Sequence, residues 1–339
     1  MSDSQRTDTF DDRGDHSPSA QRLVSLDAMR GLIMCTLALN GLAFAATAKN
    51  LGYGPDVEVT SLVGRIWQLL AFHSGHPAWN SQFYVIGCSY WDLIQPAFMF
   101  MVGVAMPYSY ANRRGRGDSN RKLVNHALLR AIVLVLIGVF LQTRTTGLDS
   151  DRLFTNVLAQ IGLGYFFVFL LLAYGPRLQI AAGVVVLVAS TGWMLQHPAP
   201  DPLPKSSAAS IESLSVPVGV ARHFAIDTNA AADFDRQLFY VIRRDESFKP
   251  HPGGYATLNF IPSAVTMLLG VLAGSLLRTS LSDRDKLKRL VLGGVICMAI
   301  AVASSYTLCP VVKRIWTPAW TLYSGAWVLW CLGGLYWLC

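Results

Sequence analysis

Long apolar segments with polar stretches between them dominate this 339-residue chain. Residues 93–111 contain no charged side chain, and a run of about 18 or more apolar residues is long enough to cross a bilayer as a helix. Similar apolar segments lie at residues 31–48, 132–143, 157–174, 178–196, 258–277, 290–305 and 320–339. Because they lack the polar stripe of a helix on a soluble protein's surface, the pattern predicts an all-α fold, a polytopic transmembrane helix bundle of about eight spans.

Composition agrees with a membrane protein. Hydrophobic residues make up 52% of the chain and charged residues 14%, whereas about 25% of the residues of a soluble domain are charged. The net charge of +7 would also suit a nucleic-acid-binding protein. The cationic side chains, however, gather in short segments between the apolar ones, where membrane topology and anionic lipid account for them. We therefore expect membrane lipid as a partner, and no nucleic acid.

Lysine and arginine residues predict the orientation of the chain. Short cytoplasmic loops are enriched in both, and two short segments hold the largest groups: Arg113, Arg114, Arg116, Arg121 and Lys122 in one, and Arg278, Arg284, Lys286, Lys288 and Arg289 in the other. Both segments fall on one face under an eight-span count, so we place that face and both termini in the cytoplasm. The loops at residues 49–91 and 197–257 then lie on the outer side.

The first residues differ from the rest of the chain. Residues 1–21 are polar, acidic and without periodicity, which is typical of disordered segments. We expect a disordered cytoplasmic tail, followed by one membrane domain over residues 22–339.

Six motifs occur in order along the membrane domain. They are RLVSLDAMRGLIMCTLALNG, HPAW, WDLIQPAFMFMVGVAMPYS, NVLAQIGLGY, GGYATLNFIPSAVTMLLGVLAG and CPVVKRIWTPAWTLYSGAW. Together they resemble the bacterial branch of the heparan-alpha-glucosaminide N-acetyltransferase family. The resemblance implies a transmembrane acyltransferase of the bacterial inner (cytoplasmic) membrane. Such an enzyme passes an acetyl group from cytoplasmic acetyl-CoA to an amino-sugar or glycan acceptor on the outer, periplasmic side.

The chain departs from the family pattern in two places. The sequence NSQFYVI at residues 80–86 stands where the family goes almost directly from its tryptophan to a short glycine-containing turn. The family also tends to carry further spans after the WTPAW segment, so we expect either a short member of the family or a chain that is truncated at its C-terminal side. Helices with glycine-rich faces would support a homodimer.

Polar residues at the rim of an apolar segment are costly to retain, which makes them candidate site residues. Acyl transfer to an amine or hydroxyl needs a base, and histidine, with an unperturbed pKa of about 6.5, suits that role. In the family the catalytic histidine lies in an H-x-x-W pattern, which His76 and Trp79 match; His73 is the alternative. Asp92 could orient the imidazole or hold a substrate hydroxyl, or it could only cap a helix N-terminus.

Three polar residues lie at the start of the first apolar segment or inside it. Asp27 and Arg30 are three residues apart and can pair on one helical face. They could also contact the phosphates of coenzyme A, or Arg30 could reach lipid headgroups. Asn40 matches an asparagine of the family and could hold the thioester or the acceptor by hydrogen bonds, or bond to a neighbouring helix.

Acetyl-CoA is the expected acyl donor. Arg113 and Arg114 are available for its phosphates, although their position in a cytoplasmic loop already accounts for them. The two histidines near residue 75 could share a helical face, but no cysteine or carboxylate stands at ligand spacing beside them. We therefore expect no metal.

Other polar residues match the family without a clear role. Asn156, Gln160 and Asn259 are amides at segment ends that could line a central cavity, or serve helix packing beside nearby glycines. Lys313 and Arg314 lie in a predicted outer segment, and the sequence assigns them no ligand.

Two other classes of function stay open. A transporter could use the buried polar residues of the first segment as a path and the prolines of the apolar segments as hinges. A scaffold or lipid-binding membrane protein would need no catalysis. An outer histidine opposite a cytoplasmic basic rim favours the enzyme, because it separates acceptor from donor across the bilayer.

Overall fold

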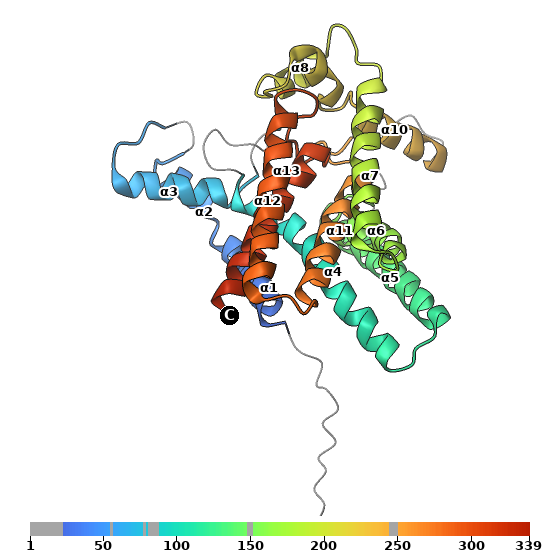
Figure 1. Ribbon diagram of the computed structural model, residues 1–339. Helices are drawn as coiled ribbons and strands as arrows, with labels where there is room; N and C mark the ends of the chain where they lie inside the picture. Colours follow the sequence, from blue (N-terminus) through green and yellow to red (C-terminus); the bar gives the residue numbers. More distant parts are fainter. Residues whose placement is uncertain (1–22, 55–56, 77–78, 81–87, 148–151, 244–249) are drawn as a thin grey trace, which may run out of the picture.

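The computed structural model describes residues 23–54, 57–76, 79–80, 88–147, 152–243 and 250–339. These residues are helical or irregular, with no β-strand among them, which confirms the all-α prediction (Figure 1). The α-helices are α1 (Val24–Leu39), α2 (Phe44–Asn50), α3 (Leu62–His73), α4 (Tyr90–Gly115), α5 (Asn120–Thr146), α6 (Val157–Leu171), α7 (Pro176–Gln196), α8 (Lys205–Ile211), α9 (Val218–Ala221), α10 (Ala230–Arg243), α11 (Phe260–Leu277), α12 (Asp283–Ser305) and α13 (Pro318–Leu338). Short 3-10 turns are η1 (Asn40–Leu42), η3 (Arg222–Phe224) and η4 (Thr257–Asn259). The predicted tail, residues 1–21, and most of the NSQFYVI segment lie outside the described residues.

Every predicted span contains a helix, but the count of eight spans is not confirmed. Five helical stretches are long and apolar enough to cross a membrane: Val24–Asn50, Asn120–Arg144, Pro176–Gln196, Thr257–Leu277 and Asp283–Ser305. Helix α6 has only 15 residues, and α4 and α13, although 26 and 21 residues long, are not among these five. The first predicted span is also not one continuous helix. It is interrupted between α1 and α2, where Ala43 adopts a left-handed φ of 48°.

Helices α4 and α11 pack with their backbones in direct contact at the centre of the bundle. A Cβ added at Gly103 of α4 would overlap the backbone carbonyl of Met267. On α11, a Cβ at Gly270 would overlap the carbonyl of Phe100, and Gly274 approaches α4 in the same way. Gly270 and Gly274 are four residues apart, the small-xxx-small spacing that lets membrane helices approach closely. The glycines therefore place α11 against α4.

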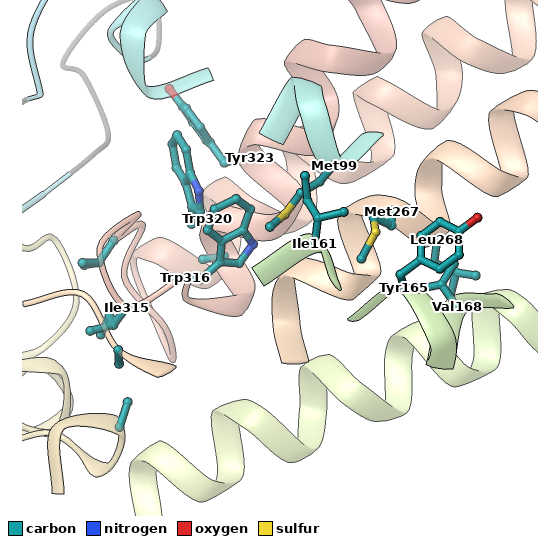
Figure 2. Close-up of a cluster of buried hydrophobic side chains, with 14 of the residues drawn as sticks. Met99, Ile161, Tyr165, Val168, Met267, Leu268, Ile315, Trp316, Trp320 and Tyr323 are labelled. Carbon is teal, nitrogen blue, oxygen red and sulfur yellow. The ribbon is translucent and has the colours of Figure 1, made fainter. Parts of the chain in front are cut away.

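Side chains of four elements meet around this contact. Figure 2 shows them: Met99 from α4, Ile161, Tyr165 and Val168 from α6, Met267 and Leu268 from α11, and Ile315, Trp316, Trp320 and Tyr323 from the α13 region. Helix α11 is the most buried of the five candidate spans. In its most apolar part 61% of the residues are buried, against at most 22% in the other four. Those four helices expose broad apolar faces, as Leu129 and Leu136 at 62% exposure illustrate for α5. Exposed apolar faces of this extent are what a lipid environment requires.

The two ends of the bundle carry different structures. Leu23, Arg278 and Tyr336 line one cavity, so the beginning of the described chain, the end of α11 and the end of α13 lie together. The opposite end bears the residues 197–257 segment, with α8 far from the C-terminus (Figure 1). The described parts of the segments expected as outer loops contain helices as well as irregular chain: residues 49–91 contain α3, and residues 197–257 contain α8, α9 and α10.

Helix α10 carries a buried carboxylate. Asp235 is 4% exposed, and its Oδ2 atom accepts a hydrogen bond of 2.9 Å from the backbone N–H of Thr257. Burial raises the pKa of Asp235 from 3.8 to about 6. Because the folded-state pKa is the higher one, this group favours folding at low pH, and its contribution is lost as the pH rises through about 6.

We predict that the α4–α11 contact does not tolerate a side chain. Gly270→Val should lower the stability of the protein in detergent by about 1–3 kcal/mol, because a branched side chain would overlap the backbone of α4. Gly192→Val is the matched control on α7, where nothing lies within 4 Å of an added Cβ. Thermal unfolding monitored by tryptophan fluorescence compares the two, and equal melting temperatures would contradict the contact.

We predict that Asp235→Asn removes a pH dependence of stability. The amide oxygen can still accept the Thr257 N–H, but the variant has no buried carboxylate to ionise. It should match the wild type near pH 4 and exceed it by about 3 kcal/mol at pH 8, from a pKa raised by about two units. Asp233→Asn, on the more exposed face of α10, should leave the pH profile of the melting temperature unchanged. A constant difference between Asp235→Asn and wild type at all pH values would refute the assignment.

Candidate functional site

Asp92 lies in the first turn of α4, with only 2% of its side chain exposed. It is not the helix cap that the sequence left open as an alternative. Ser89 is the N-cap, and its Oγ atom accepts a hydrogen bond of 3.2 Å from the Asp92 N–H. The carboxylate of Asp92 is therefore not needed for the helix terminus, and a buried charge of this kind requires partners.

Two side chains from distant parts of the chain meet the Asp92 carboxylate. Lys313 Nζ lies 2.9 Å from Asp92 Oδ1, and His76 Nδ1 lies 2.6 Å from the same oxygen. Lys313 Nζ also lies 3.2 Å from His76 Nδ1. The Lys313 side chain is 4% exposed, whereas that of His76 is 39% exposed. The cluster thus combines a buried ion pair with an imidazole that is open on one side.

The segment with His76 is fixed to the residues 197–257 segment. Trp79 is buried, and its indole N–H donates a hydrogen bond of 2.9 Å to the backbone carbonyl of Phe224. The Asn80 side chain donates one of 2.7 Å to the carbonyl of Ser213. Trp79 and Asn80, three and four residues after His76, are therefore both tied to this segment.

His73, the alternative base, has a different environment. Its Nδ1 atom accepts a hydrogen bond of 3.2 Å from the backbone N–H of Tyr90. Burial lowers the pKa of His73, which agrees with a neutral ring that accepts this bond. The structure therefore brings His76, and not His73, to the Asp92 carboxylate.

The turn that carries Lys313 is held by several hydrogen bonds. The Thr317 hydroxyl donates to the Pro310 carbonyl at 2.6 Å and accepts from the Val312 N–H at 3.0 Å. Trp316 has a φ of 43°, in the left-handed region that costs a non-glycine residue about 1–3 kcal/mol. Such a conformation persists only where its surroundings fix it, so the turn presents Lys313 rigidly.

The amides noted in the sequence support this end of the bundle. Asn259 donates a hydrogen bond of 2.8 Å to the carbonyl of Arg314, next to Lys313. Gln160 donates to the carbonyl of Thr257 at 3.1 Å, and Asn156 is the N-cap of α6. Gln160 and Asn259 hold backbone in place in this way, and Asn259 also lines a small cavity of about 30 Å³. That the three amides line a central cavity stays a prediction.

A second candidate site lies at the opposite end of the bundle, in a cavity of about 860 Å³. Its polar lining residues are Asp27, Arg30, Tyr108, Asn112, Arg278, Thr279, Asp283, Lys286 and Tyr336. Arg30 and Asp27 form an ion pair of 3.1 Å, as their spacing predicts. Lys286 lies 3.8 Å from Asp283, so two of the three cations are paired with carboxylates and the lining carries one net positive charge, which suits an anionic group.

The other candidates from the sequence lie outside both sites. Arg113 forms an ion pair of 3.3 Å with Asp118, and Arg114 is exposed; neither lines the cavity. Asn40 is the first residue of η1, at the far end of α1 from Asp27. The roles predicted for Asn40, Arg113 and Arg114 stay predictions.

The two sites are far apart along α4. Asp92 and Asn112 are 20 residues apart on this helix, which corresponds to about 30 Å at 1.5 Å per residue. Ile33, Ala97 and Met101 belong to a buried apolar cluster that packs α1 against α4 between the two ends. The cavity begins closer to Asp92, at Ala105, which is 13 residues or about 20 Å along α4 from it, so the two sites are separated by less than the about 30 Å of a bilayer's hydrocarbon layer.

Lys313 is the residue that the sequence did not assign. A lysine in the largely apolar stretch CPVVKRIW was the available signal, because a buried lysine needs an acidic partner. The sequence could not say which carboxylate that partner is, since Asp92 lies 221 residues away.

The cluster can support base chemistry at His76. With Nδ1 bonded to Asp92, the other ring nitrogen is available to accept a proton. Cys88, the nearest thiol, is a poor nucleophile, because burial and then the Asp92 charge raise its pKa. Within the described ranges, no three His, Cys, Asp or Glu side chains are grouped to hold a metal.

The helices and their exposed apolar faces define an integral membrane protein of the helical class. Comparison with protein-family models finds no match, and comparison with curated proteins finds none either. The resemblance to the acetyltransferase family therefore depends on the six motifs alone.

We predict that the Asp92–Lys313 pair behaves as a buried ion pair. Lys313→Met should lower stability by about 3–5 kcal/mol, because it leaves a buried carboxylate without its cation. Adding Asp92→Asn to this variant should restore most of the loss, since neither charge then remains. Thermal unfolding in detergent measures both, and additive losses in the double variant would contradict the pairing.

Proposed function

We propose that this protein is a membrane-bound acyltransferase. It passes an acetyl group from acetyl-CoA on the cytoplasmic side to the amine or hydroxyl of an amino sugar or glycan on the outer side of a bacterial inner membrane. The observation that carries the proposal is the contact between His76 Nδ1 and Asp92 Oδ1, at 2.6 Å. A half-open imidazole oriented by a buried carboxylate is the arrangement that general-base catalysis uses.

The chemistry follows from this geometry. The Nδ1–H of His76 donates to Asp92, and Nε2 takes the proton of the acceptor as its nitrogen or oxygen attacks the thioester carbonyl. The C–S bond breaks, the thiolate of coenzyme A leaves, and it receives the proton from the imidazolium. Asp92 stabilises that imidazolium while it exists. In the two-step alternative, Nε2 first takes the acetyl group and the acceptor then attacks the acyl-imidazole.

The cavity at the other end of the bundle supports a donor site there. Arg30, Arg278 and Lys286 provide positive charge for the phosphates of coenzyme A. The apolar cluster between the two sites must open for the acetyl group to reach His76. Helix α1 is the element best placed to move, because only 12% of the most apolar part of its span is buried.

We expect purified protein in detergent to transfer labelled acetyl groups from acetyl-CoA to a glucosamine acceptor. His76→Ala should reduce turnover by about 10²–10⁴-fold, the usual contribution of a general base. His73→Ala is the matched control and should retain most of the activity, because His73 only accepts a backbone hydrogen bond. Equal losses of turnover in the two variants would contradict the assignment of His76 as the general base.

Donor binding is tested in the same preparation by calorimetry. Arg30→Ala should weaken acetyl-CoA binding, because Arg30 lines the cavity. Arg114→Ala removes an exposed arginine outside the cavity and should leave binding unchanged. If the folded wild-type protein did not bind acetyl-CoA, this result would contradict the acyltransferase proposal and favour the transporter alternative.

A further inference from the structure

Lys313, His76 and Asp92 form a closed triangle of polar atoms. The three distances are 2.6 Å between His76 Nδ1 and Asp92 Oδ1, 2.9 Å between Lys313 Nζ and Asp92 Oδ1, and 3.2 Å between Lys313 Nζ and His76 Nδ1. An ion pair alone would need only the second of these contacts. The third places an ammonium directly beside the nitrogen through which the imidazole is oriented.

The two contacts of His76 Nδ1 require different protonation states. A lysine ammonium has donors and no acceptor, so it attracts Nδ1 only when this nitrogen carries no proton. An ionised carboxylate only accepts, so it attracts Nδ1 only when this nitrogen carries one. The contact with Asp92 is the shorter, which favours the tautomer with Nδ1–H and a free lone pair on Nε2. That tautomer is the one a base at Nε2 requires.

The charges decide between the neutral ring and the imidazolium. Asp92 alone would favour the imidazolium, because an opposite charge within about 4–6 Å stabilises a cation. Lys313 opposes this effect from a similar distance. The resting cluster of one carboxylate, one ammonium and one neutral ring has no net charge, whereas an imidazolium would add a positive charge next to the ammonium.

We infer that Lys313 is a positioning residue that keeps His76 neutral, with the Nε2 lone pair free, until the acceptor delivers its proton. This inference rests on the proposed function, since it assigns Lys313 a role in the same reaction. Lys313 acts through the ring and through Asp92, and it need not touch the substrate.

The surroundings of Lys313 suit such a role. Its turn is fixed by the Thr317 hydroxyl and contains the left-handed Trp316. The adjacent Arg314 points elsewhere, with its guanidinium 3.4 Å from the Gly253 carbonyl and its own carbonyl held by Asn259. A lysine on a flexible loop would not stay close enough to the ring to oppose the charge of Asp92. The lysine on this fixed turn does.

The titratable side chains near His76 come from three parts of the described chain. Helix α4 and the residues before it supply Asp92 and the thiol of Cys88, which its burial keeps protonated. Helix α3 supplies His73, held as an acceptor by the Tyr90 N–H. Lys313 is the cation that the turn before α13 brings to the ring.

Titration of His76 by nuclear magnetic resonance tests the inference without any turnover. The full-length protein is labelled with ¹⁵N-histidine in detergent micelles, and the His76 signal among seven histidines is assigned from the His76→Gln variant. Lys313→Met should raise the pH midpoint of the His76 titration by about one to two units, and Asp92→Asn should lower it by a similar amount. If Lys313 and Asp92 had only a structural role, the two substitutions would not shift the His76 midpoint in opposite directions.

Matched variants separate charge from folding. Lys313→Arg keeps the charge and should keep the midpoint near that of wild type, while Arg314→Met removes the neighbouring charge and should leave the midpoint unchanged. If Lys313→Met does not fold, the double variant Asp92→Asn/Lys313→Met contains no unpaired buried charge. Its midpoint should then lie about one unit above that of Asp92→Asn.

The outcomes distinguish this inference from the proposed function. The role of Lys313 would be overturned if wild type and Lys313→Met had the same His76 midpoint. It would also be overturned if Asp92→Asn and the double variant had the same midpoint. Midpoints that shift as expected in a protein without acetyl transfer would support the role of Lys313 in setting the ring and refute the acyltransferase. In an active protein, the acid side of the pH–rate profile should move with the titration midpoint in each variant.

Discussion

The close contact between α4 and α11 is the constraint on which the bundle depends. Gly103, Gly270 and Gly274 allow two backbones to touch where any side chain would overlap a carbonyl. In a membrane, helices gain little from excluding apolar surface from water, so close packing of this kind has to hold them together. Helices α6 and α13 pack around this contact, and the outer helices turn their apolar faces outward. The contact also fixes where each end of α4 lies, and both candidate sites are at its ends.

Buried charge determines the arrangement at one of these ends. A carboxylate at the start of α4 would be very costly in an apolar environment without partners. Lys313 neutralises it and His76 shares its oxygen, so that Lys313, 221 residues away, is joined to the His76–Asp92 region at one atom. The strained turn at Trp316, held by the hydroxyl of Thr317, keeps Lys313 in place. The cost of burying the charge is thus offset by a geometry that also orients an imidazole.

The opposite end of α4 differs in its chemistry. Its cavity is wide and lined by both signs of charge, with Arg278 bonded to the Pro107 carbonyl and Arg30 paired with Asp27. Packed apolar side chains of α1 and α4 lie between this cavity and the Asp92 cluster, over about 20 Å of α4 from Asp92 to Ala105. An enzyme that takes its donor from one side of a membrane and its acceptor from the other needs two such sites on one bundle.

The sequence by itself determined the helical membrane class, because apolar segments of the length of a bilayer leave the chain few other folds. It also singled out His76, Asp92, Asp27 and Arg30, since polar residues at the rim of such segments are conspicuous. It did not determine that Ser89 caps α4, that the first span is interrupted at Ala43, or that the outer segments contain helices. Above all, only the tertiary structure brought Lys313 to Asp92. The pairing of two buried charges depends on how helices distant in the sequence pack, and no local pattern around either residue specifies it.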